Sequence, residues 1–330
     1  MITVTLYHQV GQSGYDEVLA LLERMQQIFP HQVVEIDIAS NPEFLKKIGP
    51  GLPMLESGPY NLRWPFTEQD LKVMLSAASQ RREYLEKSGD RNFQERLERG
   101  ARFSRLDRLV FWLSRHYMAV FNTALFLFVG FAFLAPVLAN AGLMSAANLI
   151  YKVYSILCHQ LAFRSYFLFG FQPFYPLARA GVPGVLPYEQ LIGDVDILSA
   201  RHFIGDEYLG FKAALCERDI AIYLGFLIFG LVFSLLKNKG KPLHWLAWIV
   251  LGIIPIALDG FSQLPGLSAN LPAWLPVRES TPLLRTLTGL LFGISTAWFL
   301  FPYVAESMSE TRAILLGKLQ FTRQVTAKGN

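Results

Sequence analysis

Four long apolar runs constrain this chain more than any other feature of its sequence. They occupy residues 118–139, 220–236, 243–258 and 283–304. A helix needs about 20 apolar residues to cross the roughly 30 Å hydrocarbon core of a bilayer, and the second and third runs lie near the lower end of that range. Only 17% of the 330 residues are charged, against about 25% in soluble domains. The runs therefore predict an all-α helical membrane domain with about four transmembrane helices over 118–305.

Basic residues lie on one side of the predicted spans. Residues 91–116, before the first span, are rich in arginine, and the turn between the second and third spans contains Lys237, Lys239 and Lys241. Lysines and arginines also follow the fourth span, in 306–330. Because loops rich in Lys and Arg stay in the cytoplasm, we expect a multi-pass plasma (inner) membrane protein with both termini and this turn cytoplasmic.

The same orientation makes residues 140–218 an outward-facing cap between the first two spans. Within the cap, residues 143–157 are apolar but contain Lys152. A fifth span here would move the lysine-rich turn to the outside. We therefore interpret 143–157 as an amphipathic helix on the outer interface.

The first 80 residues predict a small α/β domain. Strand-like runs alternate along it with helices that have one apolar face. Thr67 is the expected cap of the last helix. In chain order the elements are strand 2–7, helix 17–29 with Val18, Leu21, Leu22 and Met25 on its apolar face, strand 33–38, short helix 42–49, strand 52–55 and helix 67–78. This alternation implies at least one parallel crossover between strands.

The order of elements resembles the glutaredoxin and thioredoxin-like fold over residues 1–80. In that family a Cys-x-x-Cys turn opens the first helix, whose amino terminus lowers the thiol pKa. Gln12 and Tyr15 stand at the two thiol positions in this chain, and the Gly-Leu-Pro-Met segment carries the family's cis-proline to Pro53. The resemblance implies the fold without thiol redox chemistry. We therefore expect a docking or regulatory module for a cytoplasmic protein partner.

Residues 81–117 join the two parts as a basic amphipathic linker. Phe103, Leu106, Leu109, Val110 and Leu113 recur at helical spacing among the arginines. This pattern is typical of a helix lying on an anionic leaflet. A solvated connector is an equal alternative.

Four motifs in the second part resemble the predicted membrane proteins of domain of unknown function 2085, over about residues 120–305. In order, the motifs are IYKVYSILCHQLAFRSYFLFGFQP, CERDIAIYLGFL, PIALDGFSQL and RESTPLLRTLTGLLFG. In the family the second motif often begins Cys-Ala-Arg-Cys, whereas this chain has Cys216 and then Asp219 at the second cysteine position. The resemblance implies a membrane protein and no particular activity.

Metal-ligand residue types gather near the outer ends of the predicted spans. They are Cys158, His159, Cys216, Asp219 and Asp259. Thiolate, imidazole and carboxylate are zinc ligands, and residues 216 and 219 share a helix face. Three states of the two cysteines stay open: packed free thiols, a disulfide, or zinc ligands.

Charged residues also occur at membrane depth, where they need a partner or water. One interpretation pairs Asp259 with Arg285 and so joins the third and fourth helices. The other is a polar pocket for an anionic head group or substrate, since arginine's planar fork suits phosphate and carboxylate. Its candidate residues are Gln263, Arg278, Arg285 and Thr288, beside Asp259.

No phosphate-binding glycine loop, Gly-x-Ser-x-Gly or His-Glu-x-x-His motif occurs in the sequence, so whether the protein is an enzyme stays open. The first hypothesis is a non-catalytic assembly or ligand-sensing component with an extracytoplasmic polar pocket. The alternatives are a metal-dependent membrane enzyme acting on a lipid or envelope substrate, and a small oligomeric transporter. The expected partners are the lipid bilayer and a cytoplasmic protein, and a nucleic acid is not expected.

Overall fold

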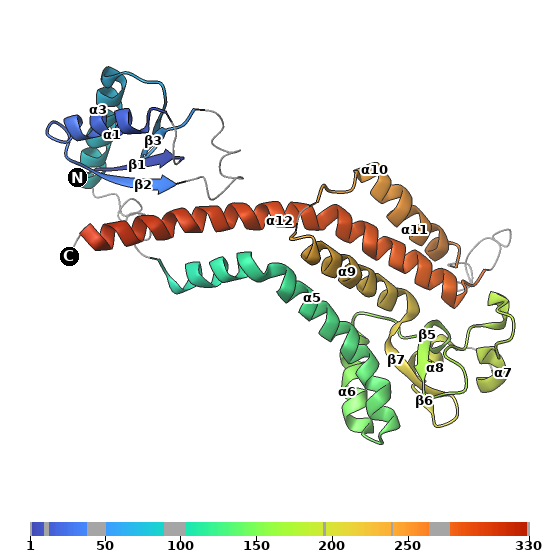
Figure 1. Cartoon of the computed structure of the whole chain (residues 1–330). Helices are drawn as coiled ribbons and strands as arrows, with labels where there is room; N and C mark the ends of the chain where they lie inside the picture. Colours follow the sequence, from blue (N-terminus) through green and yellow to red (C-terminus); the bar gives the residue numbers. More distant parts are fainter. Residues whose placement is uncertain are drawn as a thin grey trace. The chain divides into compact units, whose positions relative to one another are not determined.

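The computed structural model describes residues 2–9, 13–37, 51–88, 103–193, 196–238, 240–263 and 278–328. The chain divides into two compact units, one formed by Met1–His116 with Glu306–Asn330 and the other by Tyr117–Ala305. Figure 1 shows their elements in sequence colours. The short helix predicted over 42–49 and the predicted redox position Gln12 lie outside the described residues.

The amino-terminal unit contains a four-stranded sheet. Its strands are β1 (Ile2–His8), β2 (His31–Asp37), β3 (Met54–Ser57) and β4 (Tyr60–Arg63), in the order β2-β1-β3-β4. β1 pairs with β2 in parallel and with β3 antiparallel, and β4 is antiparallel to β3. The predicted mixed α/β character and the parallel neighbour of the first strand are thus confirmed. The peptide bond before Pro53 is cis, as the family resemblance implies.

Two helices complete the core of this unit, α1 (Tyr15–Met25) and α3 (Glu68–Lys87). The apolar face predicted for the first helix is the one that α1 buries against β1, β3 and α3. Thr67 caps α3 as predicted, and its hydroxyl accepts from the Asp70 backbone N–H at 3.2 Å while Asp70 accepts from the Thr67 backbone N–H. Satisfying these free N–H groups begins the helix at this point.

The predicted boundaries at 80 and 117 fall inside helices. α3 continues to Lys87, and α5 (Arg105–Asn140) joins the end of the predicted linker to the first span. The predicted tail is likewise part of α12 (Pro282–Lys328). Lys318 of α12 forms an ion pair with Asp107 of α5 at 2.8 Å.

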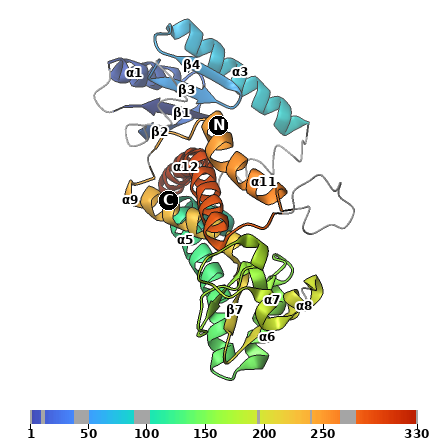
Figure 2. The same cartoon turned by 90° about the vertical axis from the view of Figure 1, so that its right-hand side faces the viewer.

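In the second unit, α9 (Glu217–Leu235) and α12 pack closely because glycines line their contact. A Cβ built on Gly293 would lie 2.2 Å from the Ile222 carbonyl oxygen, and one on Gly225 would lie 2.9 Å from the Leu290 carbonyl oxygen. Only glycine permits this approach of two helix backbones. The helical segment 245–261 lies on the other side of α12, which therefore runs between it and α9 in both views (Figures 1 and 2).

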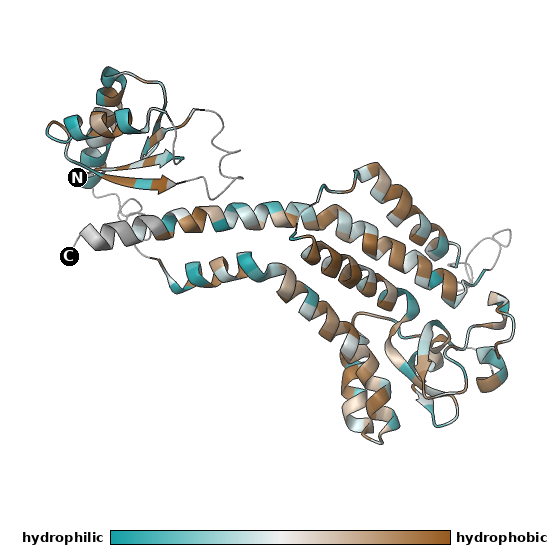
Figure 3. Ribbon diagram, in the orientation of Figure 1, coloured by the Kyte–Doolittle hydropathy of each residue, from teal (hydrophilic) through white to brown (hydrophobic). Residues whose placement is uncertain are grey.

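Within the part of the chain that the structure describes, three helices are long and apolar enough to cross a membrane, namely Arg105–Asn140, Glu217–Leu235 and Pro282–Leu319. Long stretches of these helices consist mostly of hydrophobic residues, drawn in brown in Figure 3. The third predicted span is the shorter apolar helix Trp245–Phe261. It consists of α10 (Trp245–Trp248), a π-helical turn η3 (Ile249–Ile253) and α11 (Ile254–Phe261). Pro255 follows this π turn at the start of α11, where it has no N–H to continue the α-helical ladder.

The segment predicted as a cap contains a second small sheet. β5 (Ser165–Leu168), β6 (Gly205–Asp206) and β7 (Gly210–Cys216) pair in the order β5-β7-β6. Short helical elements surround them: η1 (Ala162–Arg164), η2 (Ala178–Ala180), α7 (Tyr188–Ile192) and α8 (Ile197–His202). α6 (Met144–Tyr154) has 11 residues, too few to cross a bilayer. It buries Ala147, Tyr151 and Tyr154 and exposes the apolar Leu149 and Val153; its place on the outer interface stays a prediction.

Candidate functional site

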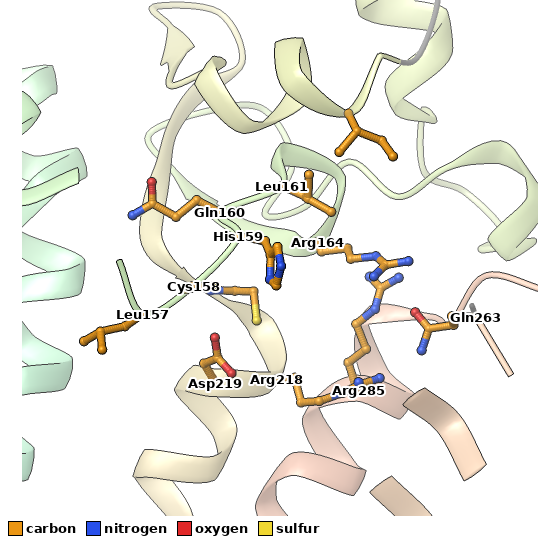
Figure 4. A pocket seen from close by; sticks show the side chains of 12 residues that line it. Leu157, Cys158, His159, Gln160, Leu161, Arg164, Arg218, Asp219, Gln263 and Arg285 are labelled. Carbon is orange, nitrogen blue, oxygen red and sulfur yellow. The ribbon is translucent and has the colours of Figure 1, made fainter. Parts of the chain in front are cut away.

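A cavity of about 570 Å³ lies where the segment after α6, the start of α9 and the start of α12 meet. Figure 4 shows its side chains, which come from segments distant in the sequence. Both thiols and three arginines are among them. The lining residues are Leu157, Cys158, His159, Gln160, Leu161, Arg164, Ile197, Cys216, Arg218, Asp219, Gln263 and Arg285.

Three predicted metal-ligand residues converge on one wall of this cavity. Cys158 follows α6, Cys216 ends β7 and immediately precedes α9, and Asp219 lies in the first turn of α9. One ligand atom from each lies within 4.8 Å of the other two. Both cysteines are free in the structure. The Cys216 backbone N–H donates to Cys158 Sγ at 3.3 Å, so the first thiol faces the amino terminus of α9.

The environment of Cys216 opposes ionisation of its thiol as long as no cation lies between the two sulfurs. Its side-chain hydrogen bond with Cys158 and its removal from water raise the pKa of the Cys216 thiol well above the usual value. A thiolate next to another thiolate or to the Asp219 carboxylate needs a neutralising cation. Without one, the Cys216 thiol keeps its proton.

The other two predicted metal-ligand residues stand apart from this group. His159 is exposed and lines the cavity beside Cys158 (Figure 4). Asp259 is 3% exposed and is held by arginines. Arg218 forms an ion pair with its Oδ2, and Arg278 Nη1 lies 3.3 Å from its Oδ1.

The predicted pairing of Asp259 with Arg285 is wrong. Arg285 is 2% exposed; its Nη1 donates to Glu217 Oε2 at 3.1 Å, and its Nη2 pairs with Glu279. Arg164 also holds Glu279, through Nε at 2.8 Å and Nη2 at 2.9 Å. Arg285 points from α12 toward α9 and the cap, where two carboxylates are in reach, while Asp259 on α11 faces Arg218. Asp259 of α11 and Arg285 of α12 therefore have different charged partners.

The residues predicted for an anion pocket are divided between the cavity and its surroundings. Gln263 and Arg285 line the cavity. Arg278 donates to Ser262 Oγ at 2.6 Å and supports Asp259. Thr288 is turned to its own helix, since its Oγ1 donates to the Leu284 carbonyl at 2.8 Å.

Arg164, Arg218, Glu217 and Glu279 are the site residues that the sequence analysis did not single out. All four lie inside the quoted motifs and close to the ends of apolar runs. Charged residues at such positions need partners. That requirement could have identified them as a group, although it could not have assigned the pairs.

The predicted redox positions in the amino-terminal unit carry no thiol. Tyr15 opens α1, and its hydroxyl donates to Glu35 Oε2 at 2.5 Å. This hydrogen bond is the main reason that the pKa of Tyr15 is raised to about 12. A protonated phenol in this place acts as a structural donor.

Three helices of membrane-spanning length and composition, together with the buried charges at their ends, place this chain among the α-helical membrane proteins. Residues 204–299 match the family model described as predicted membrane protein (DUF2085). The resemblance to domain of unknown function 2085 is confirmed over that range. The uncharacterized protein MJ1492 of Methanocaldococcus jannaschii is 26% identical over 202 residues, which cover 59% of this chain and 96% of that protein.

Proposed function

We propose that this protein spans the plasma (inner) membrane four times and binds an anionic ligand in its outward-facing cavity, as a ligand-sensing or assembly component. The observation that carries the proposal is the excess of arginine around the cavity. Arg164, Arg179 and Arg285 share two carboxylates, those of Glu217 and Glu279. A separate pair of arginines, Arg218 and Arg278, shares the Asp259 carboxylate. Five guanidinium groups thus face three carboxylates.

Unused hydrogen-bond donors support the same proposal. Among the described residues, Arg218 Nε and Arg285 Nε are buried and have no hydrogen-bond partner. Both side chains line the cavity. A buried donor without an acceptor costs about 1–3 kcal/mol, and more when it is charged. A phosphate or carboxylate group in the cavity would supply the missing acceptors and offset the positive charge.

The proposed four-span topology rests on length and charge. Trp245–Phe261 is apolar and lies against α12, and 17 helical residues extend about 25 Å, near the lower limit for a span. Counting it as a span places the basic residues of 306–330 on the same cytoplasmic side as the lysine-rich turn before it. A single cysteine at Lys241 in a cysteine-free background should be labelled by an impermeant maleimide only after the cells are opened, and one at the exposed Tyr208 in intact cells. The reverse pattern would refute the orientation.

We also propose that the amino-terminal unit is thioredoxin-like and docks a cytoplasmic protein. Support comes from the strand order β2-β1-β3-β4, with the two strands that flank α1 parallel and the last two antiparallel. Fold alone does not give function, and Tyr15 lacks the chemistry of a thiol. A binding role fits a domain that keeps the scaffold without its nucleophile.

The test compares two arginines that contact the same carboxylate. Arg164 and Arg179 both reach Glu279, but among the two only Arg164 lines the cavity. Inorganic phosphate would be titrated into the detergent-purified chain by calorimetry. Arg164→Gln should weaken binding about 10–100-fold, the equivalent of one charge-assisted hydrogen bond, and Arg179→Gln should leave it within about twofold. Equal effects of the two substitutions, or no binding of any anion, would refute the proposal.

A parallel measurement distinguishes a lipid head group from a free phosphate. The same two variants would be reconstituted in vesicles of phosphatidylcholine with or without phosphatidylglycerol. If the ligand is a lipid head group, phosphatidylglycerol should raise the thermal midpoint of the original chain and of Arg179→Gln. The thermal midpoint of Arg164→Gln should rise by a smaller amount. If it is a soluble phosphate, the rise should come with inorganic phosphate alone.

A second candidate function is a metal-dependent membrane enzyme acting on a lipid or envelope substrate. The thiol and carboxylate group on the wall of the same cavity favours it. A metal ion there would supply a Lewis acid beside arginines that bind an anion. Turnover of a phosphodiester substrate that is lost in Cys216→Ser would favour this alternative over a purely binding role.

A further inference from the structure

Two thiols of the cap and a carboxylate from the first turn of α9 converge within one small volume. The ligand atoms of Cys158, Cys216 and Asp219 all lie within 4.8 Å of one another. We propose that these three side chains bind one divalent ion of the zinc type, and that a fourth coordination position is open to the cavity. The proposal does not depend on anion binding, because it rests on the donor atoms alone.

The donor set suits zinc by chemistry and by size. Zinc favours thiolate with nitrogen or carboxylate oxygen, at about 2.3 Å for sulfur and 2.0–2.2 Å for oxygen. Tetrahedral geometry with these bonds separates two sulfurs by about 3.8 Å. The three ligand atoms lie within 4.8 Å of one another. To reach a tetrahedral arrangement they need to move closer by about 1 Å, a shift of the size that side-chain rotation supplies. Calcium and magnesium prefer oxygen ligands only.

The backbone under the three ligands is held in place by hydrogen bonds. Ser165 of β5 pairs with Cys216 in the sheet. The Gln160 amide, two residues after Cys158, donates to the Tyr151 carbonyl at 3.0 Å and to the Ala214 carbonyl at 2.8 Å. These bonds tie the segment after α6 to β7. A ligand set fixed before binding loses little conformational entropy when the ion enters.

The amino terminus of α9 stabilises the charged ligands. Cys216 is the residue before the helix and Asp219 is in its first turn, where the helix dipole favours negative charge. The Cys216 backbone N–H already points at Cys158 Sγ, a donor that stabilises a thiolate. The two positions are also three residues apart and share a helix face. The chain thus offers two thiolates and a carboxylate to one ion.

The open position distinguishes this site from a structural zinc site, which has four protein ligands. His159 lies next to Cys158 and lines the cavity, but it is outside the converging group. A water molecule or an oxygen of a bound anion would complete the coordination from the cavity side. Arg164 and Arg218 line the same space, so an anion bound there would meet the ion and the guanidinium groups together.

The test uses the full chain in detergent, reduced and freed of metal, and titrated with cobalt(II). One cobalt ion per chain is expected, with thiolate-to-metal charge-transfer absorption and the visible bands of a tetrahedral site, both abolished by one equivalent of zinc. Cys158→Ser and Cys216→Ser should each show a weaker charge-transfer band, because each variant has lost one of the two sulfur ligands. Removal of residues that only support ligands already costs 10–100-fold, so Asp219→Asn should weaken binding by about 100-fold or more.

Two control variants in the same cap keep the test specific. Glu207 and His202 are exposed and outside the converging group, so Glu207→Gln and His202→Asn should bind cobalt like the original chain. His159→Asn should also retain binding, and its loss would overturn the open fourth position. Because the cysteine variants can fail to fold, the spectrum of the original chain decides by itself. Binding without a charge-transfer band, or no binding by the fully reduced chain, would overturn the proposal.

Discussion

A buried lysine makes the stability of the cap rise with pH in a higher pH window than paired carboxylates do. The Lys212 side chain in β7 is 0% exposed. Its Nζ donates to the Gln160 carbonyl at 2.6 Å and to the Arg201 carbonyl at 2.7 Å. No carboxylate forms an ion pair with it among the residues that the structure describes. A neutral amine has two N–H groups, which is what these two carbonyls require.

Burial is the main cause that lowers the pKa of Lys212 from 10.5 to about 7, and Arg201 lowers it further while Cys158 raises it. Each pKa unit is worth about 1.4 kcal/mol, so a charged Lys212 destabilises the fold by up to about 5 kcal/mol. Between about pH 7 and 10 the unfolded chain keeps the proton that the folded chain has lost. Stability therefore rises with pH in this window, by up to about 1.4 kcal/mol per pH unit.

Thermal midpoints of the full chain in detergent, at pH 7.5 and 9.5, test this reasoning. The difference of about 3 kcal/mol corresponds to a rise of roughly 5–10 °C for a unit of this size. Lys212→Met should lack the rise, and Lys152→Met, at an exposed position on α6, should keep it. An equal rise in Lys212→Met would refute the assignment to this lysine.

Three further substitutions test the packing, the buried charges and the helix cap. Gly293→Val should lower the thermal midpoint and the yield of monodisperse protein because its side chain meets the backbone of α9, whereas Gly130→Val, with open space around it, should not. Arg285→Met should cost about 3–5 kcal/mol by leaving a buried carboxylate unpaired, and Glu217→Gln in the same chain should recover part of the loss; no recovery would contradict the pair. Thr67→Ala should cost about 1 kcal/mol and speed hydrogen exchange in the first turn of α3, while an unchanged rate would contradict the cap.

Local patterns predicted the elements that local forces determine. The apolar face of α1 and the Thr67 cap follow from helical spacing and from the need of free N–H groups for an acceptor. The long apolar helices follow from hydropathy alone. The sequence also predicted that Cys158, Cys216 and Asp219 lie near one another. The reason is that alternating spans bring the ends of α6 and β7 to one side of the membrane domain.

The charge pairs could not be predicted in the same way. Asp259 and Arg285 are conspicuous charges in the apolar segments, yet Asp259 pairs with Arg218 and Arg285 with Glu217, two residues that the sequence analysis passed over. Ion pairs are decided by which side chains face each other across packed helices, and hydropathy holds no information on helix rotation. The π turn within 245–261 likewise has no signature in hydropathy.

The first turn of α9 explains why these separate features belong to one site. Glu217, Arg218 and Asp219 are consecutive, so their side chains leave the helix about 100° apart and cannot share a partner. Glu217 meets Arg285 of α12, Arg218 meets Asp259 of α11, and Asp219 approaches the two thiols. One helical turn therefore contacts α12, α11 and the end of α6 at the same depth. One residue of each contact, namely Arg285, Arg218 and Asp219, lines the cavity, so the proposed anion would meet all three contacts at once.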